Sequence, residues 1–429
     1  MSTLAADVIA DACAEDEIAV IQLALVGLAS DAARQRGLDR LSRLLGPDDA
    51  TLDNYVRDLR TPAPPGAGEV VAASVAAALG PTPRQRRTAV GALHRTATRA
   101  LPGLWRWIVD RSAESGGWTG WWSRCADHDT TVEWMAQDRA ARCAAAAVDE
   151  WGRLGGVSTP KAEPTWRWLQ TGRCLGAPGV DYRRALTLTA TAFRQRGLLP
   201  TTHHVTLSSR TMTRSVAVPI RIPGRSVMVV SDTGSATDVR FLHHELAHVA
   251  EHAVRRADLP LDGRWSFDPV RSEGWALLCE NLVHDPDWWA EIGLGPLDER
   301  TRAFHLAVDE FSRTVIDARV ALDGMIDGCR DVVGLRRAGE EIAGRLGIDC
   351  HPAVLAMGVA NGGQWRAYAA GFEWAERASE ILTVRFGSPW WRAEASWRAL
   401  RDVLETPGSA RAALDRLRLA GTSPGPPPT

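Results

Sequence analysis

A short segment of this chain combines two histidines and a glutamate at a spacing that suits a divalent metal. Residues 242–248, LHHELAH, contain an HExxH pattern in which His244 and His248 stand four residues apart. On a helix, residues four apart share one face, so both imidazoles can bind one metal ion while Glu245 lies beside them. A glutamate there can take a proton from metal-activated water, which makes Glu245 the candidate general base of a hydrolase.

A catalytic zinc ion needs a third protein ligand and one open position for water. Glu273, in the downstream segment SEGWALL at residues 272–278, is the candidate for that ligand. The predicted cofactor is therefore Zn²⁺, bound by His244, His248 and Glu273. Glu280 stands two helical turns after Glu273, and two interpretations are open: a carboxylate that accepts a hydrogen bond from a ligating histidine, or a solvated helix glutamate.

The residues around the HExxH motif predict the helix that must position it. Ser235 and Asp238 resemble a capping box, with Thr237 as a rival N-cap. The helix that follows has apolar residues at helical spacing, namely Val239, Leu242, Leu246, Val249, Ala250 and Ala253.

The segment that carries Glu273 predicts a second helix. Asp268-Pro269 is typical of a helix start and Asp285-Pro286 of a helix stop. Residues 257–264, between the two predicted helices, have the composition of a loop. Two antiparallel helices joined by this loop would bring Glu273 opposite the histidine pair.

Several of these segments resemble known metallopeptidases. HExxH on one helix with a ligand glutamate on the next is similar to the Glu-zincin arrangement of the thimet oligopeptidase group, and residues 238–245 resemble the run-in to its zinc helix. EGWAL at residues 273–277 resembles the EGWALY segment of domain of unknown function 885, whose members are regarded as zinc peptidases. GQWRAYAAG at residues 363–371 resembles that family's PGQxxxYxxG motif, and RAFHLAVD at residues 302–309 resembles its central R-x-x-R-x-x-V-D helix.

The resemblance covers roughly residues 232–417 and implies a zinc peptidase fold there. It also implies a catalytic role for Tyr368, which occupies the tyrosine of the PGQxxxYxxG-like segment and could donate a hydrogen bond to a developing oxyanion. The alternative is an aromatic core residue with its hydroxyl at the edge. Gln364 and Arg366, in the same segment, are candidates for contacts with a substrate backbone or carboxylate.

The chain departs from that family at two positions. The family has Pro-Gly between the first His-Glu pair and the second histidine, whereas this chain has a compact HExxH at residues 244–248. Leu278 replaces the tyrosine of EGWALY, so that hydroxyl has no role here. Residues 1–200 contain no recognisable family motif. The resemblance therefore says more about fold and metal site than about substrate.

Length and composition are those of an ordinary globular enzyme. The chain has 429 residues, of which 45% are hydrophobic and 24% charged, enough to bury a large core. Its formal net charge of −2 gives no reason to expect nucleic acid or an anionic membrane as a partner. Seven cysteines without a CxxC pair favour a reducing compartment. With no evident signal peptide or membrane-spanning apolar run, we expect a cytoplasmic protein.

The chain as a whole predicts a mostly α-helical fold. A helical shell is expected around a small antiparallel β-sheet that leads into the HExxH zinc helix and a second ligand-bearing helix. Three β-branched runs predict the strands, at residues 203–207, 214–220 and 226–231. The predicted organisation is an N-terminal helical segment, a helical region, a zinc-site region and a disordered tail, at residues 1–60, 69–200, 201–420 and 421–429.

Three functions are compatible with these features. The first is a zinc metallopeptidase that cleaves peptides or peptide-like amides. The second is a zinc-dependent hydrolytic or tailoring enzyme of a biosynthetic pathway, acting on a non-peptide carbonyl. The third is a non-catalytic protein in which zinc only joins two helices, although such a site has no need of a base such as Glu245. Five other histidines are predicted to be structural or at the surface, namely His203, His204, His243, His252 and His305.

Overall fold

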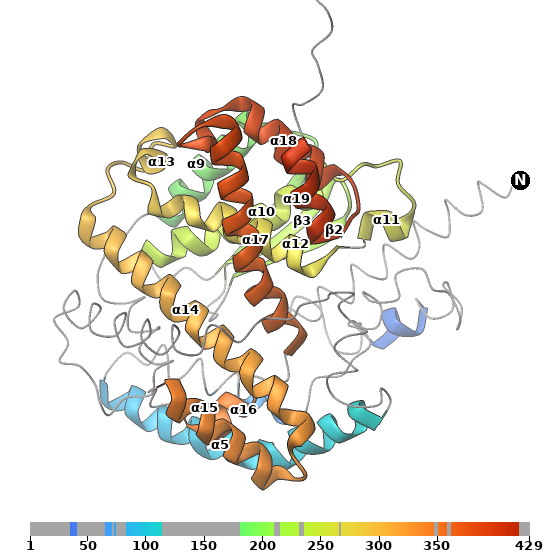
Figure 1. Ribbon diagram of the computed structural model, residues 1–429, viewed down its shortest axis with the longest axis vertical. Helices are drawn as coiled ribbons and strands as arrows, with labels where there is room; N and C mark the ends of the chain where they lie inside the picture. The colour runs from blue at the N-terminus through green and yellow to red at the C-terminus, as the bar shows by residue number, and fades with distance from the viewer. Residues whose placement is uncertain are drawn as a thin grey trace, which may run out of the picture.

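The computed structural model describes residues 35–40, 65–70, 73, 83–113, 181–209, 215–230, 236–265, 267–346, 351–357 and 362–419. Within these ranges the chain is mostly helical and carries a small β-sheet, as the sequence predicts (Figure 1). The elements before and including the HExxH helix are α5 (Pro83–Ala113), α9 (Tyr182–Gln195), β1 (His204–Ser209), β2 (Val216–Arg221), β3 (Arg225–Val230) and α10 (Ala236–Val254).

The elements after α10 are all helical. The α-helices are α11 (Leu261–Trp265), α12 (Pro269–Glu280), α13 (Pro286–Glu291), α14 (Glu299–Met325), α15 (Val332–Leu346), α16 (Pro352–Met357), α17 (Gly362–Phe386), α18 (Glu394–Glu405) and α19 (Ala410–Leu419). The 3₁₀-helices are η2 (Asn281–His284), η3 (Ile326–Gly328) and η5 (Trp390–Arg392).

The sheet differs from the predicted antiparallel one. Its strand order is β1-β3-β2, and β1 pairs with β3 in parallel while β2 pairs with β3 antiparallel. The tight Pro223-Gly224 turn makes β2 and β3 a hairpin, which the sequence signals. The pairing of β1 is long-range, because β1 lies beside β3 rather than beside its neighbour in sequence. The sheet is therefore mixed, and β2 is an edge strand that faces α10.

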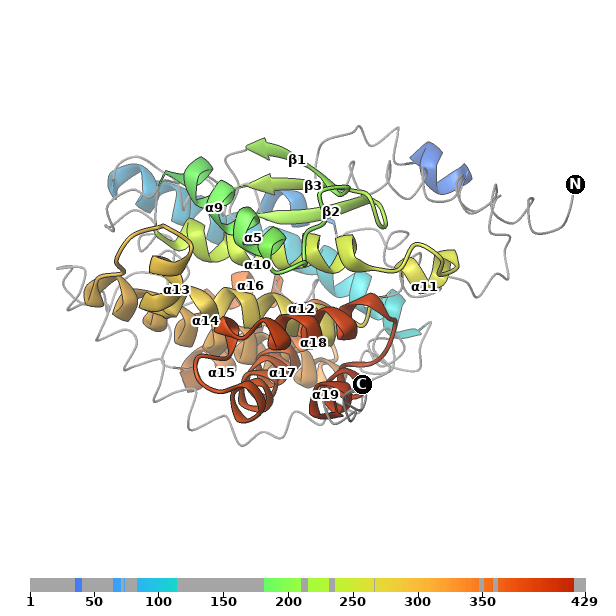
Figure 2. The ribbon, with the colours of Figure 1, turned by 90° about the horizontal axis from the view of Figure 1, so that it is seen from above.

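Successive layers run from the sheet to the C-terminal helices. Figure 2 shows the sheet on one side, α10 beneath it, α12 next, and α17 with α18 and α19 on the far side. The pairs α10 and α12, and α12 and α17, are in extensive contact. Gly274 of α12 lies against the Trp374 ring, and Gly371 of α17 lies against the backbone of Glu273 and Gly274. The absence of side chains at these two glycines lets α12 and α17 approach closely.

An aspartate N-cap begins the helix that carries Glu273. The Asp268 carboxylate accepts a hydrogen bond from the backbone N–H of Arg271 at 3.0 Å, and Pro269 occupies the first turn. The α-helix ends at Glu280, and η2 completes the segment up to Asp285, which caps α13. The predicted limits at Asp268 and Asp285 are thus confirmed. In the HExxH helix, Asp238 lies in the first turn of α10, where the predicted capping box places it, but Ser235 lies outside the described residues, so the cap itself stays a prediction. The rival cap Thr237 lies inside α10 and is therefore wrong.

Two hydrophobic clusters form the described core. The larger one surrounds α10, α12 and α17, and includes the fully buried Trp275 and Trp397. The second joins α5, the C-terminal half of α14, α15 and α16. Helix α14 therefore contributes to both clusters, and Figure 1 shows it running from one to the other. The predicted division of the chain at residues 60, 69, 200 and 420 stays a prediction, and the predicted tail at 421–429 lies outside the described residues.

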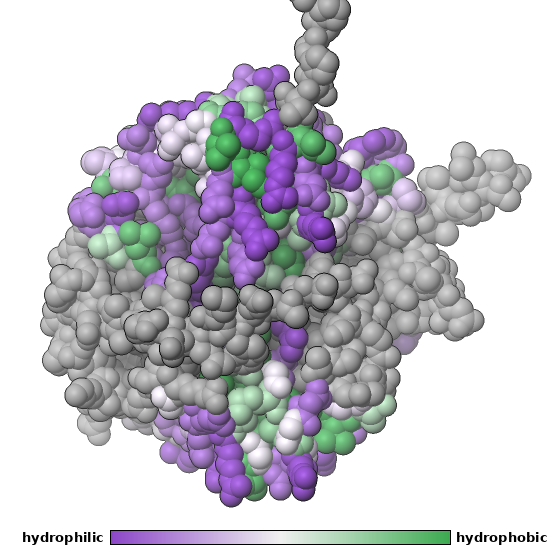
Figure 3. Space-filling view, viewed as in Figure 1, coloured by the Kyte–Doolittle hydropathy of each residue, from purple (hydrophilic) through white to green (hydrophobic). Residues whose placement is uncertain are grey.

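Polar side chains predominate among the described residues on one face of the molecule (Figure 3). In Figure 3, hydrophilic side chains cover most of the outer helices, with smaller apolar patches between them. Among the described residues, no helix combines the length and the apolar character needed to cross a bilayer.

Candidate metal centre

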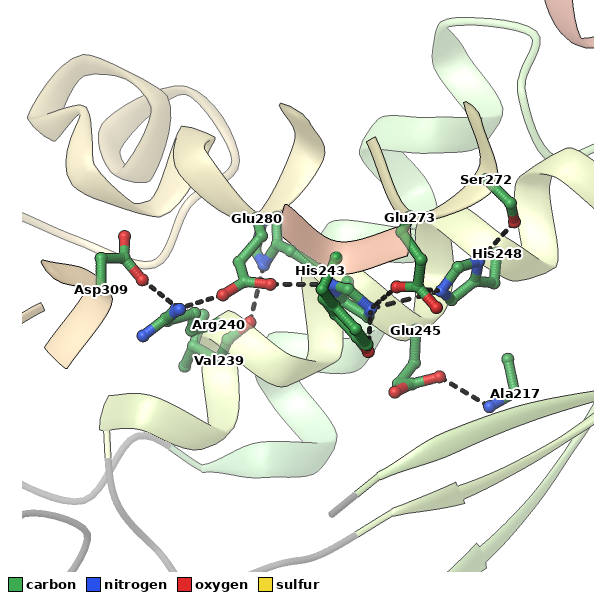
Figure 4. Close-up of polar contacts among 12 residues, drawn as sticks. Ala217, Val239, Arg240, His243, Glu245, His248, Ser272, Glu273, Glu280 and Asp309 are labelled. Carbon is green, nitrogen blue, oxygen red and sulfur yellow. Dashed lines mark hydrogen bonds and ion pairs between the residues drawn. The ribbon is translucent and has the colours of Figure 1, made fainter. Parts of the chain in front are cut away.

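Helices α10 and α12 run antiparallel and face each other through the predicted ligands. His244, near the middle of α10, contacts Glu280 at the end of α12, whereas His248, one turn later, contacts Ser272 near its beginning. The structure thus brings His244, His248 and Glu273 together from two helices, as the sequence predicts (Figure 4). One potential ligand atom from each of the three residues lies within 4.8 Å of the other two.

The spacing of these three atoms fits a zinc ion. The two Nε2 atoms of His244 and His248 lie 3.2 Å apart, and Glu273 Oε2 lies 3.4 Å from the first and 3.7 Å from the second. Tetrahedral zinc with bonds of about 2.0–2.1 Å requires ligand atoms about 3.3 Å apart. Glu273 Oε2 is also buried without a hydrogen bond from any described residue. A cation held by all three atoms would satisfy this oxygen.

Glu280 orients the first histidine from behind. Its Oε2 lies 2.7 Å from His244 Nδ1. An ionised carboxylate only accepts hydrogen bonds, so His244 donates its Nδ1–H to Glu280 and turns Nε2 toward Glu273. Of the two sequence interpretations of Glu280, the structure therefore shows the carboxylate that contacts a histidine, since its side chain is 5% exposed.

A buried ion network extends from Glu280 to the N-terminal part of α14. The Arg240 guanidinium, four residues before His244, pairs with the carboxylates of Glu280 and Asp309. Asp309 Oδ2 in turn lies 2.6 Å from His284 Nε2 (the first part of this chain is drawn in Figure 4). Because these charges are buried, each needs its partner to offset the loss of hydration. The sequence alone does not reveal the pairing of Arg240 with Asp309, because it depends on the packing of α14 at this place.

The carboxylates control the protonation of the metal-free site. Desolvation would lower the pKa of His244, but the carboxylates of Glu273 and Glu280 beside it outweigh this effect and raise the pKa to about 10. Burial favours a higher pKa for Glu273, yet the two histidines hold it well below its usual range. A metal ion at these ligands therefore has to displace a proton from His244. The pKa values of His244, Glu273 and Glu280 are all strongly shifted, and such a cluster marks a candidate functional site.

Glu245 lies between the histidines and the edge of the sheet. Its Oε2 accepts a hydrogen bond from the backbone N–H of Ala217 in β2 at 2.6 Å (Figure 4). This contact fixes one carboxylate oxygen and leaves Oε1 for a proton. Burial raises the pKa of Glu245, although the charges of His244 and His248 and the Ala217 hydrogen bond oppose the shift. A raised pKa brings a carboxylate closer to the range of a general base.

Tyr368 reaches the same site from α17. Its hydroxyl lies 3.4 Å from His244 Nε2, and its ring stacks on the His244 ring with an interplanar angle of 14°. The side chain is half-buried, with its ring packed against the larger core cluster. Of the other two candidates from that segment, Gln364 is exposed, and Arg366 pairs with Asp323 at 2.6 Å.

The remaining histidines make structural contacts. His243 lies between the Val239 carbonyl and the Trp288 indole, whose Nε1–H it accepts at 3.0 Å. His203 and His252 both contact the Ser226 hydroxyl, at 3.0 and 3.4 Å. Desolvation lowers the pKa of His203 and of His243 to about 4 and that of His305 to about 3, so all three are neutral at ordinary pH. His204 is exposed in β1.

Comparison with known proteins shows the fold. No family profile matches the chain, and no curated protein is similar to it in sequence. PZ peptidase A, solved with an inhibitor, is similar to the chain with a TM-score of 0.58 and 11% identity, covering 95% of this chain and 82% of that one. A carboxypeptidase from Pyrococcus furiosus has a TM-score of 0.53 and 11% identity, covering 96% and 94%. A protein designated CHT has a TM-score of 0.57 and 13% identity, covering 96% and 94%.

The chain therefore shares the fold of PZ peptidase A and of the Pyrococcus furiosus carboxypeptidase. The predicted resemblance to metallopeptidases is confirmed as a likeness of fold, together with a cluster of His244, His248 and Glu273 that could hold a metal ion. The resemblance to domain of unknown function 885 in particular stays a prediction, because identities of 11–13% show the fold alone.

Proposed function

We propose that this protein is a zinc-dependent metallopeptidase that hydrolyses peptides or peptide-like amides. The observation that carries the proposal is the convergence of His244, His248 and Glu273 beside the buried carboxylate of Glu245. A site that only joined two helices would have no use for such a base. The fold that the chain shares with solved peptidases supports a peptide substrate over other carbonyl compounds.

The chain's own residues supply base and hydrogen-bond donor for amide hydrolysis. When bound, zinc would lower the pKa of the attacking water and polarise the scissile carbonyl. Glu245 would take the proton of the attacking water at Oε1, while Ala217 holds Oε2, and later pass that proton to the leaving amine. The Tyr368 hydroxyl would donate a hydrogen bond to the oxyanion that develops on the carbonyl oxygen.

Edge strand β2 adds a reason to favour an extended peptide. The Ala217 N–H points away from β3 toward Glu245, so this edge passes directly beside the proposed base. The outer edge of a strand offers backbone groups that can pair with an extended chain. A peptide aligned along β2 would pass its backbone next to Glu245.

Metal content is the first test of the proposed ligands. We expect the wild-type protein to bind about one zinc ion per chain and His248→Ala to lose most of it, because two remaining ligands cannot complete the site. Elemental analysis after dialysis measures this, and circular dichroism checks that the helices persist. His252→Ala is the matched control, since His252 is a buried histidine one turn later on α10. Stoichiometric zinc in His248→Ala would contradict the assignment.

Digestion of a peptide library tests the activity. Zinc-loaded wild-type protein should produce new peptide termini, detected by mass spectrometry, and the chelated protein should produce none. If the protein binds one zinc ion but cleaves no peptide, the proposal of a peptidase is wrong. The same zinc-loaded protein would then be assayed on esters and other carbonyl compounds, the substrates of the alternative hydrolase or tailoring enzyme.

A further inference from the structure

The two histidine ligands have different partners at their outer ring nitrogens. His244 Nδ1 contacts a carboxylate directly, that of Glu280. His248 Nδ1 instead lies 3.2 Å from a neutral hydroxyl, Ser272 Oγ. Ser272 immediately precedes Glu273, so one turn of α12 carries both the third proposed ligand and the group behind the second (Figure 4). Ser272 therefore lies next to the proposed metal site, in contact with one of its ligands.

The Ser272 hydroxyl is also bonded to a buried carboxylate. Ser272 Oγ lies 2.6 Å from Oε2 of Glu251, whose side chain is fully buried on α10. Glu251 Oε1 accepts a hydrogen bond from Arg271 at 3.0 Å and lies 3.7 Å from a guanidinium nitrogen of Arg255. Both arginine side chains are fully buried. Two buried cations thus surround one carboxylate.

The guanidinium groups of Arg271 and Arg255 both face the Glu251 carboxylate. Burial lowers the pKa of Arg255 to about 10, so its guanidinium is still charged at neutral pH, and arginine does not deprotonate under these conditions. A guanidinium only donates hydrogen bonds, so the Glu251 oxygen that faces these two groups acts as an acceptor. Glu251 is therefore a carboxylate that only accepts hydrogen bonds.

The single proton of the serine then decides the state of His248. With Glu251 able only to accept, Ser272 donates its proton to Glu251, and only a lone pair of Oγ remains for His248. His248 must therefore donate from Nδ1, which places its proton there and leaves the Nε2 lone pair facing His244 Nε2 and Glu273 Oε2. The same reasoning at Glu280 gives the same tautomer to His244. The Nε2 atoms of both histidines and one carboxylate oxygen thus converge, as the ligand atoms of a metal ion must.

We propose that Ser272 is a positioning residue of the zinc site, which relays the charge of Glu251 to His248 and holds that histidine in its Nδ1–H, metal-binding tautomer. The inference rests on the proposed zinc site. Its further content is that one ligand is oriented by a carboxylate and the other by a hydroxyl that a carboxylate polarises. Partners of this kind affect metal affinity by about 10- to 100-fold.

Zinc affinity of serine variants tests this role. Ser272→Ala removes the acceptor of His248 Nδ1–H, and we expect the dissociation constant for zinc, measured by competition with a chromophoric chelator, to rise about 10- to 100-fold. Ser272→Thr keeps the hydroxyl and should restore affinity close to the wild-type value. Ser396→Ala is the matched control, since Ser396 is a buried serine whose hydroxyl bonds the carbonyl of Trp390 at 2.8 Å. It should lower the melting temperature without changing zinc affinity.

Nuclear magnetic resonance supplies a readout that general stability does not move. In protein labelled with ¹⁵N-histidine, two-bond correlations of zinc-free wild type should show His248 protonated at Nδ1, with His248→Ala assigning the signal. Protonation at Nε2 alone would overturn the proposal even if Ser272→Ala does not fold. So would unchanged zinc affinity in Ser272→Ala, or equal losses in Ser272→Ala and Ser396→Ala. If wild type itself binds no zinc, the proposed metal site fails, which is a distinct result.

Discussion

Glu245→Gln should retain its zinc and lose about 10²- to 10⁴-fold in turnover of any peptide that the wild type cleaves. The amide is nearly the same size as the carboxylate, and its carbonyl oxygen can still accept the Ala217 N–H that Glu245 Oε2 accepts at 2.6 Å. The NH₂ group then takes the place of Oε1. This NH₂ group only donates hydrogen bonds, so it cannot take the proton of the attacking water as the carboxylate oxygen does. Zinc content and kcat measured on one preparation separate chemistry from binding.

An exposed glutamate provides the control for this substitution. Glu394 at the start of α18 has a side chain that is 84% exposed, so Glu394→Gln should leave both zinc and turnover unchanged. Near-normal turnover in Glu245→Gln would exclude Glu245 as the base. Loss of zinc in Glu245→Gln would instead mean that the Ala217 contact supports the metal site structurally, because Glu245 is not among the three residues whose ligand atoms converge.

The sequence predicts the ligand-bearing helices well because their information is local. HExxH places two imidazoles on one face of a helix, whatever the fold. Asp268-Pro269 starts a helix because the Asp268 carboxylate accepts a hydrogen bond from a backbone N–H of the first turn, and Pro269 has no N–H that needs a partner. Glu273 could be chosen because a site with only two histidines lacks a ligand. Each of these inferences needs only residues within a few positions of one another.

The parts that the sequence did not predict depend on long-range packing. β1 pairs with β3 in parallel, so β2 lies at the other edge of the sheet, and no residue in β1 predicts this pairing. Arg240 reaches Asp309 only because α14 packs beside η2, which follows α12. Glu251 has the spacing of an ordinary helix glutamate until Arg271 and Ser272 are brought against it. Buried charges are rare, so a sequence alone favours a solvated surface for each of them.

The sequence resemblance predicts a catalytic role for Tyr368, whereas its contacts depend on the packing of α17 against α12. Gly371 and Gly274 let α17 approach α12 closely, and this approach stacks the Tyr368 ring on His244 with the hydroxyl 3.4 Å from Nε2. A hydroxyl at a ligand atom, rather than at the outer edge of the core, favours the catalytic interpretation over the structural one. We therefore expect its removal to affect turnover more than stability.

Tyr368→Phe should lower kcat by about 10²- to 10³-fold, equivalent to about 3–4 kcal/mol of transition-state stabilisation, with little change in KM. The substitution removes one donor and almost no volume, and the ring can still stack on His244. Of the three tyrosines, Tyr182 is the matched control, because it is buried at the start of α9 in the same core cluster. Tyr182→Phe should change the melting temperature slightly and leave kcat unaltered. Should Tyr368→Phe behave in the same way, its hydroxyl takes no part in catalysis, and the oxyanion would have to be stabilised without it.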